Sequence, residues 1–334
     1  MECDQRTAPA PGCKYYSKGG LCRLPYMFRC IEYVYSHEAP LSYSSMRDFC
    51  QCKRKYYHST IQGLIMKPEQ TPIRMLMGSI WSEVLDEIHK KESVNNSVKD
   101  RIAMVLAKYK TNYVFKTDTG KQIPKELAAI QALSDYYGQS DYAEVKGTPQ
   151  AEFRWILPDY PEVHGYIDLL VKLSSDAPCW AYEFKYSQQP DNMLNRFVMS
   201  DQLTTYFLGY DNLQRITVRA FQVPMLEPGR DKNMDSYTKR VYNDIVSRPK
   251  HYIKESTFWR SEFRDDMEMV KVKANLINED IHRTPHLFSE GGLGVGAWIQ
   301  NKLSCFVPSP CQYLPICENG NISDDIYIKR EVKL

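Results

Sequence analysis

Two carboxylates and an ammonium group interrupt two apolar segments in the middle of the sequence. Asp168 lies in HGYIDLLV (164–171), and Glu183 and Lys185 lie in YEFKY (182–186). Aliphatic, β-branched and aromatic residues dominate both segments, as is typical of strands. Alternation along a strand puts Glu183 and Lys185 on one face. An acid in an apolar run is unfavourable unless it is compensated. A divalent cation that prefers oxygen ligands would compensate both acids. The alternative is a buried Glu183–Lys185 pair beside an unrelated acid.

A pair of polar residues follows these segments. Gln202 and Tyr206 are four residues apart in a stretch that we expect to be one helix from Leu194 to Tyr210, so they share one helical face. Taken alone, this spacing is also that of ordinary helix packing.

The three segments together resemble the PD-(D/E)XK nuclease superfamily and, within it, the RecB-like branch. The motifs that carry the resemblance are GYID (165–168), EFK (183–185) and QLTTY (202–206). The resemblance implies that Asp168, Glu183 and the backbone carbonyl of Phe184 bind Mg²⁺ or Mn²⁺, and that Lys185 assists the attacking water. It also implies that the polar pair on the helix lines a nucleic-acid groove.

The upstream segment GSIWSEVLD (78–86) is similar to the first helix of that family, which usually carries Gly-x-x-x-His with an acid four residues later. Ser82 stands here where the histidine would be. Either Glu83 or a water is then expected as the remaining metal ligand. Glu152 resembles a supporting acid of the family, or else it is a solvent-facing residue of its strand.

Three of the ten cysteines lie near the C-terminus, at Cys305, Cys311 and Cys317, in a proline-containing segment with few helix-forming residues. Such a segment can wrap around a metal centre, and a fourth thiolate would complete a Cys₄ iron–sulfur site. The chain is similar here to iron–sulfur nucleases of the RecB-like branch, the AddB-type and CRISPR-adaptation exonucleases. They place one cysteine before the nuclease core and three after it. The resemblance implies a 4Fe-4S cluster with Cys52 as the fourth ligand and Cys50 as the alternative. A zinc site and unligated thiols are the other interpretations.

Four further cysteines lie in the segment 1–40. This segment is too short for a core of its own, so we expect it to need a metal or a partner surface. Cys13, Cys22 and Cys30, completed by Cys3 or His37, would form a small zinc module, although their spacing matches no zinc pattern cleanly. The alternative is a mobile arm with free thiols.

Length and composition are compatible with a nucleic-acid enzyme. A chain of 334 residues that is 43% hydrophobic can bury a large core. No apolar run approaches the roughly 18 residues of a membrane span, and the start does not read as a signal peptide. We therefore expect a cytoplasmic protein without membrane association, in which clustered cysteines favour metals over disulfides. The net charge is only +2, so binding to phosphates needs local basic patches. Lys53, Arg54 and Lys55 form one candidate.

We expect an α/β fold with a restriction-endonuclease-like core, a central mixed sheet flanked by helices, and helical and Cys-rich appendages. Helices are expected at about 44–58, 74–92, 97–110 and 124–138, and strands near 150–157, 163–173, 179–186 and 215–223. The nuclease domain would span 41–334, with its core at about 74–225, a helical insertion at about 232–284 and a cluster-binding tail at about 300–320.

The resemblance implies a Mg²⁺- or Mn²⁺-dependent DNase. Within it we expect an exonuclease that acts on DNA ends or single strands in recombination, repair or phage DNA processing, accompanied by a helicase or recombination protein. The alternative is a catalytically inactive nucleic-acid-binding module of a larger recombination complex. The departure at Ser82 favours the alternative, whereas the intact Asp168, Glu183 and Lys185 argue against it.

Overall fold

The computed structural model describes residues 41–67, 71, 73–90, 97–112, 115–117, 120–122, 125–156, 162–172, 177–198, 200–227, 231, 233–283, 300–305, 311–319 and 322–329. The segment 1–40, with the candidate zinc ligands Cys3, Cys13, Cys22 and Cys30, lies outside the described residues.

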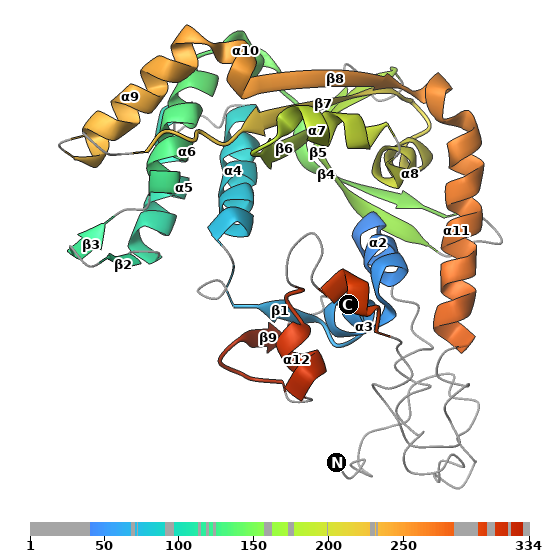
Figure 1. Ribbon diagram of the computed structural model, residues 1–334. Helices are drawn as coiled ribbons and strands as arrows, with labels where there is room; N and C mark the ends of the chain where they lie inside the picture. The colour runs from blue at the N-terminus through green and yellow to red at the C-terminus, as the bar shows by residue number, and fades with distance from the viewer. Residues whose placement is uncertain are drawn as a thin grey trace, which may run out of the picture.

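A five-stranded mixed sheet forms the centre of the molecule, with its strands side by side in chain order (Figure 1). The strands are β4 (Thr148–Trp155), β5 (Val163–Lys172), β6 (Cys179–Ser187), β7 (Leu213–Gln222) and β8 (Ile253–Trp259). Only β6 and β7 run parallel, and the other neighbours are antiparallel. A parallel pair needs a crossover connection, which two helices between β6 and β7 provide. The expected α/β class, with a helix, three strands, a helical segment and a strand, is confirmed.

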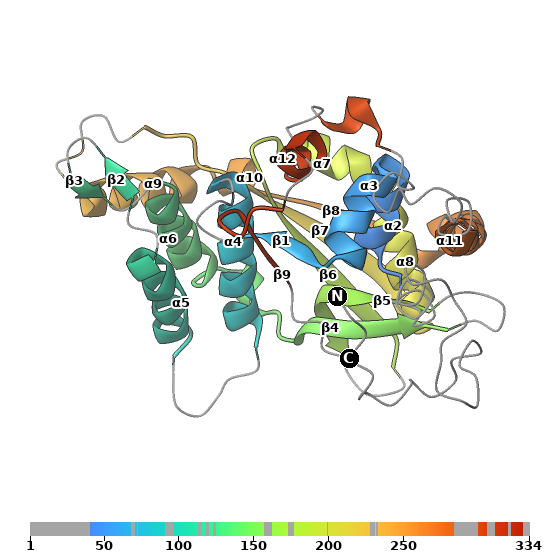
Figure 2. The same ribbon diagram turned by 90° about the horizontal axis from the view of Figure 1, so that it is seen from below.

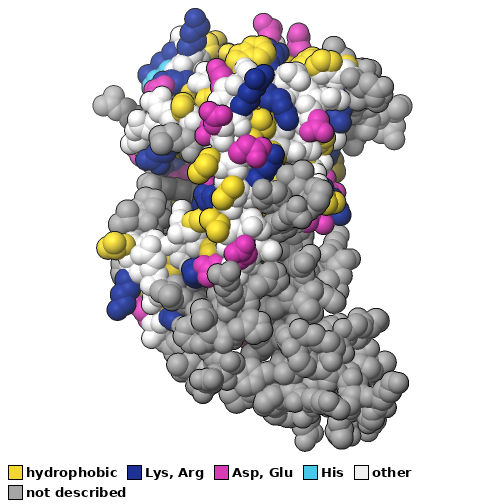
Figure 3. Space-filling model, turned by 90° about the vertical axis from the view of Figure 1, so that its right-hand side faces the viewer, with side chains coloured by type: hydrophobic (Ala, Val, Ile, Leu, Met, Phe, Trp, Pro, Cys, Tyr) yellow, Lys and Arg dark blue, Asp and Glu magenta, His cyan; other side chains and the backbone are white. Residues whose placement is uncertain are grey.

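Helices cover both faces of this sheet. The crossover helices are α7 (Pro190–Phe197) and α8 (Asp201–Gly209), and α8 packs against α11 (Arg264–Arg283). The opposite face is covered at one end by α4 (Ile73–His89), α5 (Val98–Asn112), α6 (Lys125–Tyr137) and α9 (Met234–Ser247), as Figure 1 shows. On the side of the molecule that α11 occupies, exposed hydrophobic side chains stand among charged ones (Figure 3).

The alternation of side chains along β6 connects it to two separate cores. Cys179 and Ala181 face α7 and α8, together with Leu203 and Phe207 of α8. Phe184, whose side chain points to the opposite face of β6, packs in the other core, beside α4. Glu183 and Lys185 therefore belong to the face that carries the crossover helices.

Smaller elements join the two ends of the chain beside the sheet. They are α2 (Tyr43–Gln51), α3 (Lys53–Tyr56), the π-helix Tyr57–Ile61, β1 (Leu64–Met66), the 3₁₀-helix Lys302–Cys305, α12 (Leu314–Asn319) and β9 (Tyr327–Lys329). Strands β1 and β9 pair antiparallel, and α12 lies beside α3 in two views (Figure 1, Figure 2). The remaining elements are β2 (Phe115–Thr117), β3 (Gly120–Gln122), α10 (Pro249–Tyr252) and the 3₁₀-helices Asp141–Glu144 and Arg260–Phe263.

Two expectations about individual elements were wrong, and a third was incomplete. The helix expected at 44–58 is interrupted at Cys52, which has an extended backbone conformation. The single helix expected from Leu194 to Tyr210 is two helices, because Ser200 caps a new one by accepting from the backbone N–H of Gln202. The stretch at 232–284 is mostly helical, as expected, with α9, α10 and α11. It also contains β8, an unexpected strand that forms the edge of the central sheet.

No helix in the described part of the chain has the length and apolar character that a membrane crossing requires.

Candidate active site

Strands β5 and β6 separate at the two acidic residues. Their pairing ends with Leu169 opposite Tyr182, although β6 continues along β7 as far as Ser187. The next opposed positions would be Asp168 and Glu183. There the backbone N–H of Phe184 donates to Asp168 Oδ2 at 2.7 Å. A side chain thus takes the place of a backbone acceptor, and both carboxylates lie where the sheet opens.

The carboxylate of Glu183 is buried but fully engaged. Only 1% of the surface of its side chain is exposed to solvent. Oε1 accepts from Lys185 Nζ and, at 2.7 Å, from Gln202 Nε2. Oε2 accepts from the hydroxyl of Tyr206 at 2.9 Å. A buried charge is tolerated only when such donors replace water, so these three side chains hold the carboxylate in place.

Lys185 stands at the opening of this site. Its side chain keeps 29% of its exposure, and its ammonium lies 5.8 Å from the centre of the Phe197 ring. Burial disfavours the ammonium form, but the charges of Glu183 and Asp168 outweigh it and raise the pKa of Lys185. The side chain is therefore cationic at neutral pH and reaches solvent.

Asp168 faces more negative charge than positive. Burial, followed by the charge of Glu183, raises the pKa of Asp168 to about 7, although Lys185 and the Phe184 N–H act in the opposite direction. Asp86 of α4 also raises the pKa of Asp168, and burial raises the pKa of Asp86 itself to about 6. Three carboxyl groups thus interact at one place without enough cationic charge to balance them.

Asp86 was not among the residues selected from the sequence. Its carboxylate accepts a hydrogen bond from Gln150 Nε2 at 3.2 Å, and its negative charge contributes to the raised pKa of Asp168. Glu83, the residue selected instead, is bound by Lys108 and by the hydroxyl of Tyr109 on α5. The signal was available, because Asp86 is the acid four residues after Ser82 in the segment that resembles the family's first helix.

The two polar residues of α8 both donate to Glu183. Tyr206 is only 4% exposed and meets the ring of Phe153 edge-on at 5.5 Å, so its ring is not available for stacking on a base. Gly165 of the GYID motif lies against the same ring, where an added Cβ would come within 2.8 Å of Phe153. This close approach accounts for a glycine at position 165.

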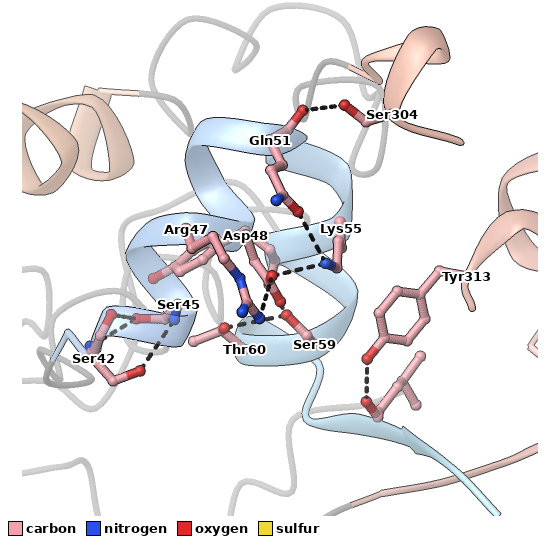
Figure 4. A network of polar contacts seen from close by, with 12 residues as sticks. Ser42, Ser45, Arg47, Asp48, Gln51, Lys55, Ser59, Thr60, Ser304 and Tyr313 are labelled. Atoms are coloured by element: carbon pink, nitrogen blue, oxygen red, sulfur yellow. Dashed lines mark hydrogen bonds and ion pairs between the residues drawn. The ribbon is translucent and has the colours of Figure 1, made fainter. Parts of the chain in front are cut away.

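The basic residues selected from the sequence have acidic partners or other neighbours. Lys53 pairs with Asp280 of α11, and Lys55 lies 2.8 Å from Asp48 (Figure 4). The positive charge of Arg54 lowers the pKa of the Cys317 thiol, against the larger opposite effect of burial. Two of these three cations are therefore already neutralised by the protein.

The four cysteines expected to share a metal centre come into one neighbourhood. Burial raises the pKa of Cys311 and of Cys317. The thiols of Cys52 and Cys305 raise both values further, and Cys311 also raises that of Cys317. Those partners include Cys52 and Cys305, which accept from the backbone N–H of Asn301 at 3.4 Å and from Gln300 Nε2 at 3.3 Å. Cys50, the alternative ligand, is exposed.

Polar contacts fasten the C-terminal segment to the first helices around these thiols. Ser304 donates to the backbone carbonyl of Gln51 at 3.0 Å, and the hydroxyl of Tyr313 donates to that of Leu64 at 2.7 Å (Figure 4). The residues joined in this way are 253 and 249 positions apart in the chain.

Neither the carboxyl groups around Asp168 nor the four cysteines are arranged as a complete set of metal ligands. Among the described residues, no three His, Cys, Asp or Glu side chains converge closely enough to hold an ion. Two surface hollows, of about 670 and about 800 Å³, lie between α5, α6 and α9 and beyond the end of β6. Neither is lined by Asp168, Glu183 or Lys185.

Comparison with known proteins places these features in a family. The sequence model of the PD-(D/E)XK nuclease superfamily matches residues 40–318. Among solved structures, the chain is similar to a candidate exonuclease from Eubacterium rectale, with 10% sequence identity and a TM-score of 0.45 over 90% of this chain and 95% of that one. None of the curated proteins matches the chain.

Proposed function

The chain belongs to the PD-(D/E)XK nuclease superfamily, and on that premise we propose that it is a metal-dependent DNase whose active centre contains Asp168, Glu183 and Lys185. The observation that supports this most strongly is the opening between β5 and β6, where two carboxylates and an ammonium meet. A nuclease needs such a combination to neutralise a phosphate and to direct water to it.

The residues fit Mg²⁺ or Mn²⁺ as the cofactor. Hard divalent cations prefer carboxylate and carbonyl oxygens, and the interacting carboxyl groups of Asp168, Glu183 and Asp86 carry the excess negative charge that such an ion would neutralise. We propose Asp168 and Glu183 as the principal ligands, with the Phe184 carbonyl beside them. Asp86 is the better candidate than Glu83 for the contribution from the helix. When bound, the ion supplies charge neutralisation and activation of water.

The protein side chains have distinct tasks in this proposal. Lys185 is cationic and partly exposed, so it can orient a water and offset charge that develops on the phosphate. Gln202 and Tyr206 hold the Glu183 carboxylate in one orientation, which is a positioning role.

We further propose that the four thiols of Cys52, Cys305, Cys311 and Cys317 bind a 4Fe-4S cluster, as in the RecB-like branch. Burial and the neighbouring thiols of Cys52 and Cys305 raise the pKa values of Cys311 and Cys317, so these four free thiols form a donor set that a cationic centre would stabilise. The centre would be structural, because it would join α2 and α3 to the C-terminal tail. A zinc module in 1–40, a nuclease domain over 41–334 and a cytoplasmic location belong to the same proposal.

The mode of action that we propose is exonucleolytic cleavage from DNA ends or along single strands, together with a helicase or recombination partner. The test uses the full chain purified without oxygen, analysed for iron, sulfide and zinc, and then incubated with linear and covalently closed circular DNA in Mg²⁺, Mn²⁺ or EDTA. We expect iron with sulfide, and degradation of linear DNA only when a divalent ion is present. Cutting of closed circles at the same rate would refute the exonuclease, and binding without any cleavage would support the inactive module.

The thiol assignment is tested by single serine variants. Each of the four should lose iron, sulfide and visible absorption, whereas Cys50→Ser and Cys179→Ser should keep them. Cys179 is a suitable control because it is buried in the central sheet. Zinc in place of iron in the wild type, or retained iron in all four variants, would refute the cluster.

A further inference from the structure

Three side chains form a row across strands β6, β7 and β8. Trp180 is paired in register with Arg215, and Arg215 is paired with Trp259. The guanidinium carbon of Arg215 lies 5.5 Å from the ring centre of Trp180 and 5.9 Å from that of Trp259. Cross-strand neighbours on one face are close enough to interact, so one cation stands between two indole rings. We call these three residues the Trp–Arg–Trp row.

The row lies at the uncovered end of a sheet face whose other end is buried. Further along the same face, the ring of Phe221 meets Trp81 of α4 at 4.8 Å, and the guanidinium of Arg219 lies 4.7 Å from the ring of Tyr142. By contrast, Trp259 is 48% exposed. Figure 1 shows α4, α6 and α9 over one end of the sheet, with β8 running out beyond them toward α11. The described helices therefore leave this row open.

The electrostatics of the two arginines on this face differ. Arg219 is buried and paired with Glu255 of β8. Arg215 lies between the two indole rings, and among the described residues it forms no ion pair with an acidic side chain. Packing explains Arg219, but it does not explain why a cation without a carboxylate partner is presented beside a half-exposed tryptophan.

We propose that the Trp–Arg–Trp row is a binding platform for single-stranded nucleic acid. Indole and guanidinium planes stack on the faces of unpaired bases, and the positive charge attracts the phosphates. Bases inside a duplex have their faces covered by their neighbours, so the platform selects single strands. The inference rests on the proposed nucleic-acid substrate, but it concerns a different surface from the active centre.

The platform and the active centre lie on opposite faces of β6. Trp180 precedes Glu183 by three positions, and an odd separation along a strand puts two side chains on opposite faces. The separation along the strand is about 10 Å, at roughly 3.3 Å per residue. The platform therefore binds nucleotides of the single-stranded nucleic acid that lie away from the phosphodiester bond being cut.

The experiment measures binding and chemistry separately. Fluorescence anisotropy of a labelled oligo(dT) and of a labelled duplex is recorded with full-length protein in a Glu183→Gln background, which prevents cleavage. Trp259→Ala should weaken binding of the single strand by about tenfold, within the range for one stacked base. Trp259→Phe should retain most of it because it keeps an aromatic face. Arg215→Gln should weaken binding and reduce its dependence on salt. Met269→Ala, at an exposed position of α11, is the matched control and should change nothing.

The outcomes separate this inference from the nuclease proposal. Unchanged affinity of Trp259→Ala and Arg215→Gln for oligo(dT) would overturn the platform, as would an equal loss for duplex and single strand. Hydrolysis of the small substrate thymidine 5′-(p-nitrophenyl phosphate) by the Trp259→Ala variant of the otherwise wild-type chain should match wild type. If the wild type hydrolyses nothing while the binding differences remain, the nuclease proposal fails and the platform stands.

Discussion

Removal of the Tyr206 hydroxyl is the most specific test of how the Glu183 carboxylate is held in place. Lys185 and Gln202 both donate to Oε1, and the donor that the structure gives to Oε2 is Tyr206. Tyr206→Phe keeps the ring and removes the hydroxyl, which donates to Glu183 and also accepts from Gln202 Nε2 at 2.6 Å. Glu183 and Tyr206 are 1% and 4% exposed, so water does not easily replace it. Loss of a hydrogen bond to a buried charged group costs about 1.5–3 kcal/mol, and we expect the free energy of unfolding to fall by that amount.

The assay is urea unfolding of the metal-free protein at pH 8, with Tyr210→Phe as the matched control. The hydroxyl of Tyr210 donates to the backbone carbonyl of Glu152 at 2.6 Å in an exposed position, so its removal should cost about 1 kcal/mol or less. Equal losses in the two variants, or no loss in Tyr206→Phe, would refute the conclusion that Tyr206 holds a buried carboxylate.

Two further predictions concern the charge at the site. Asp86→Asn should weaken Mn²⁺ binding, measured by calorimetry, by about 10-fold or more, as expected when a group that supports metal ligands is lost, whereas Glu83→Gln should leave it unchanged; the reverse order would restore Glu83 as the contributing residue. In the metal-free protein, the free energy of unfolding should decrease as the pH rises from about 4 to about 7. Burial and Glu183 raise the folded-state pKa of Asp168 to about 7 from 3.8, so protonation of this carboxyl favours the folded state at low pH and that stabilisation is lost as it ionises. Asp168→Asn should flatten this dependence in denaturant titrations across that range, and an unchanged slope would contradict the electrostatic account of the site.

The motif strands could be predicted from sequence because local pattern and tertiary environment agree there. Runs of aliphatic, β-branched and aromatic residues identify β5 and β6, and the acids that interrupt them mark the opening of the sheet. The strand β8 was missed because its residues Lys254–Trp259 are two charged, two hydroxylic and two aromatic residues in succession, without apolar alternation. Their conformation depends on pairing with β7, a non-local contact that propensity does not contain.

The helix contribution to the site illustrates the same limit. Glu83 and Asp86 are three residues apart on α4, and sequence alone does not say which of them is turned toward the sheet. The docking of α4 decides it, because α5 supplies Lys108 and Tyr109 to Glu83. Tyr206 is a similar case: its spacing from Gln202 was readable, but its burial against Phe153 depends on how α8 packs.

Cleavage of end-labelled DNA under single-turnover conditions, by wild type and by Glu183→Gln in the same Mn²⁺ buffer, tests the central claim most directly. Glutamine preserves the size of the side chain and removes the charge that Lys185, Gln202 and Tyr206 surround. We predict that the wild type releases labelled product only with the divalent ion and that the variant releases none above the background without enzyme, while both bind the DNA. Cleavage by the variant at the wild-type rate would contradict the assignment of this site.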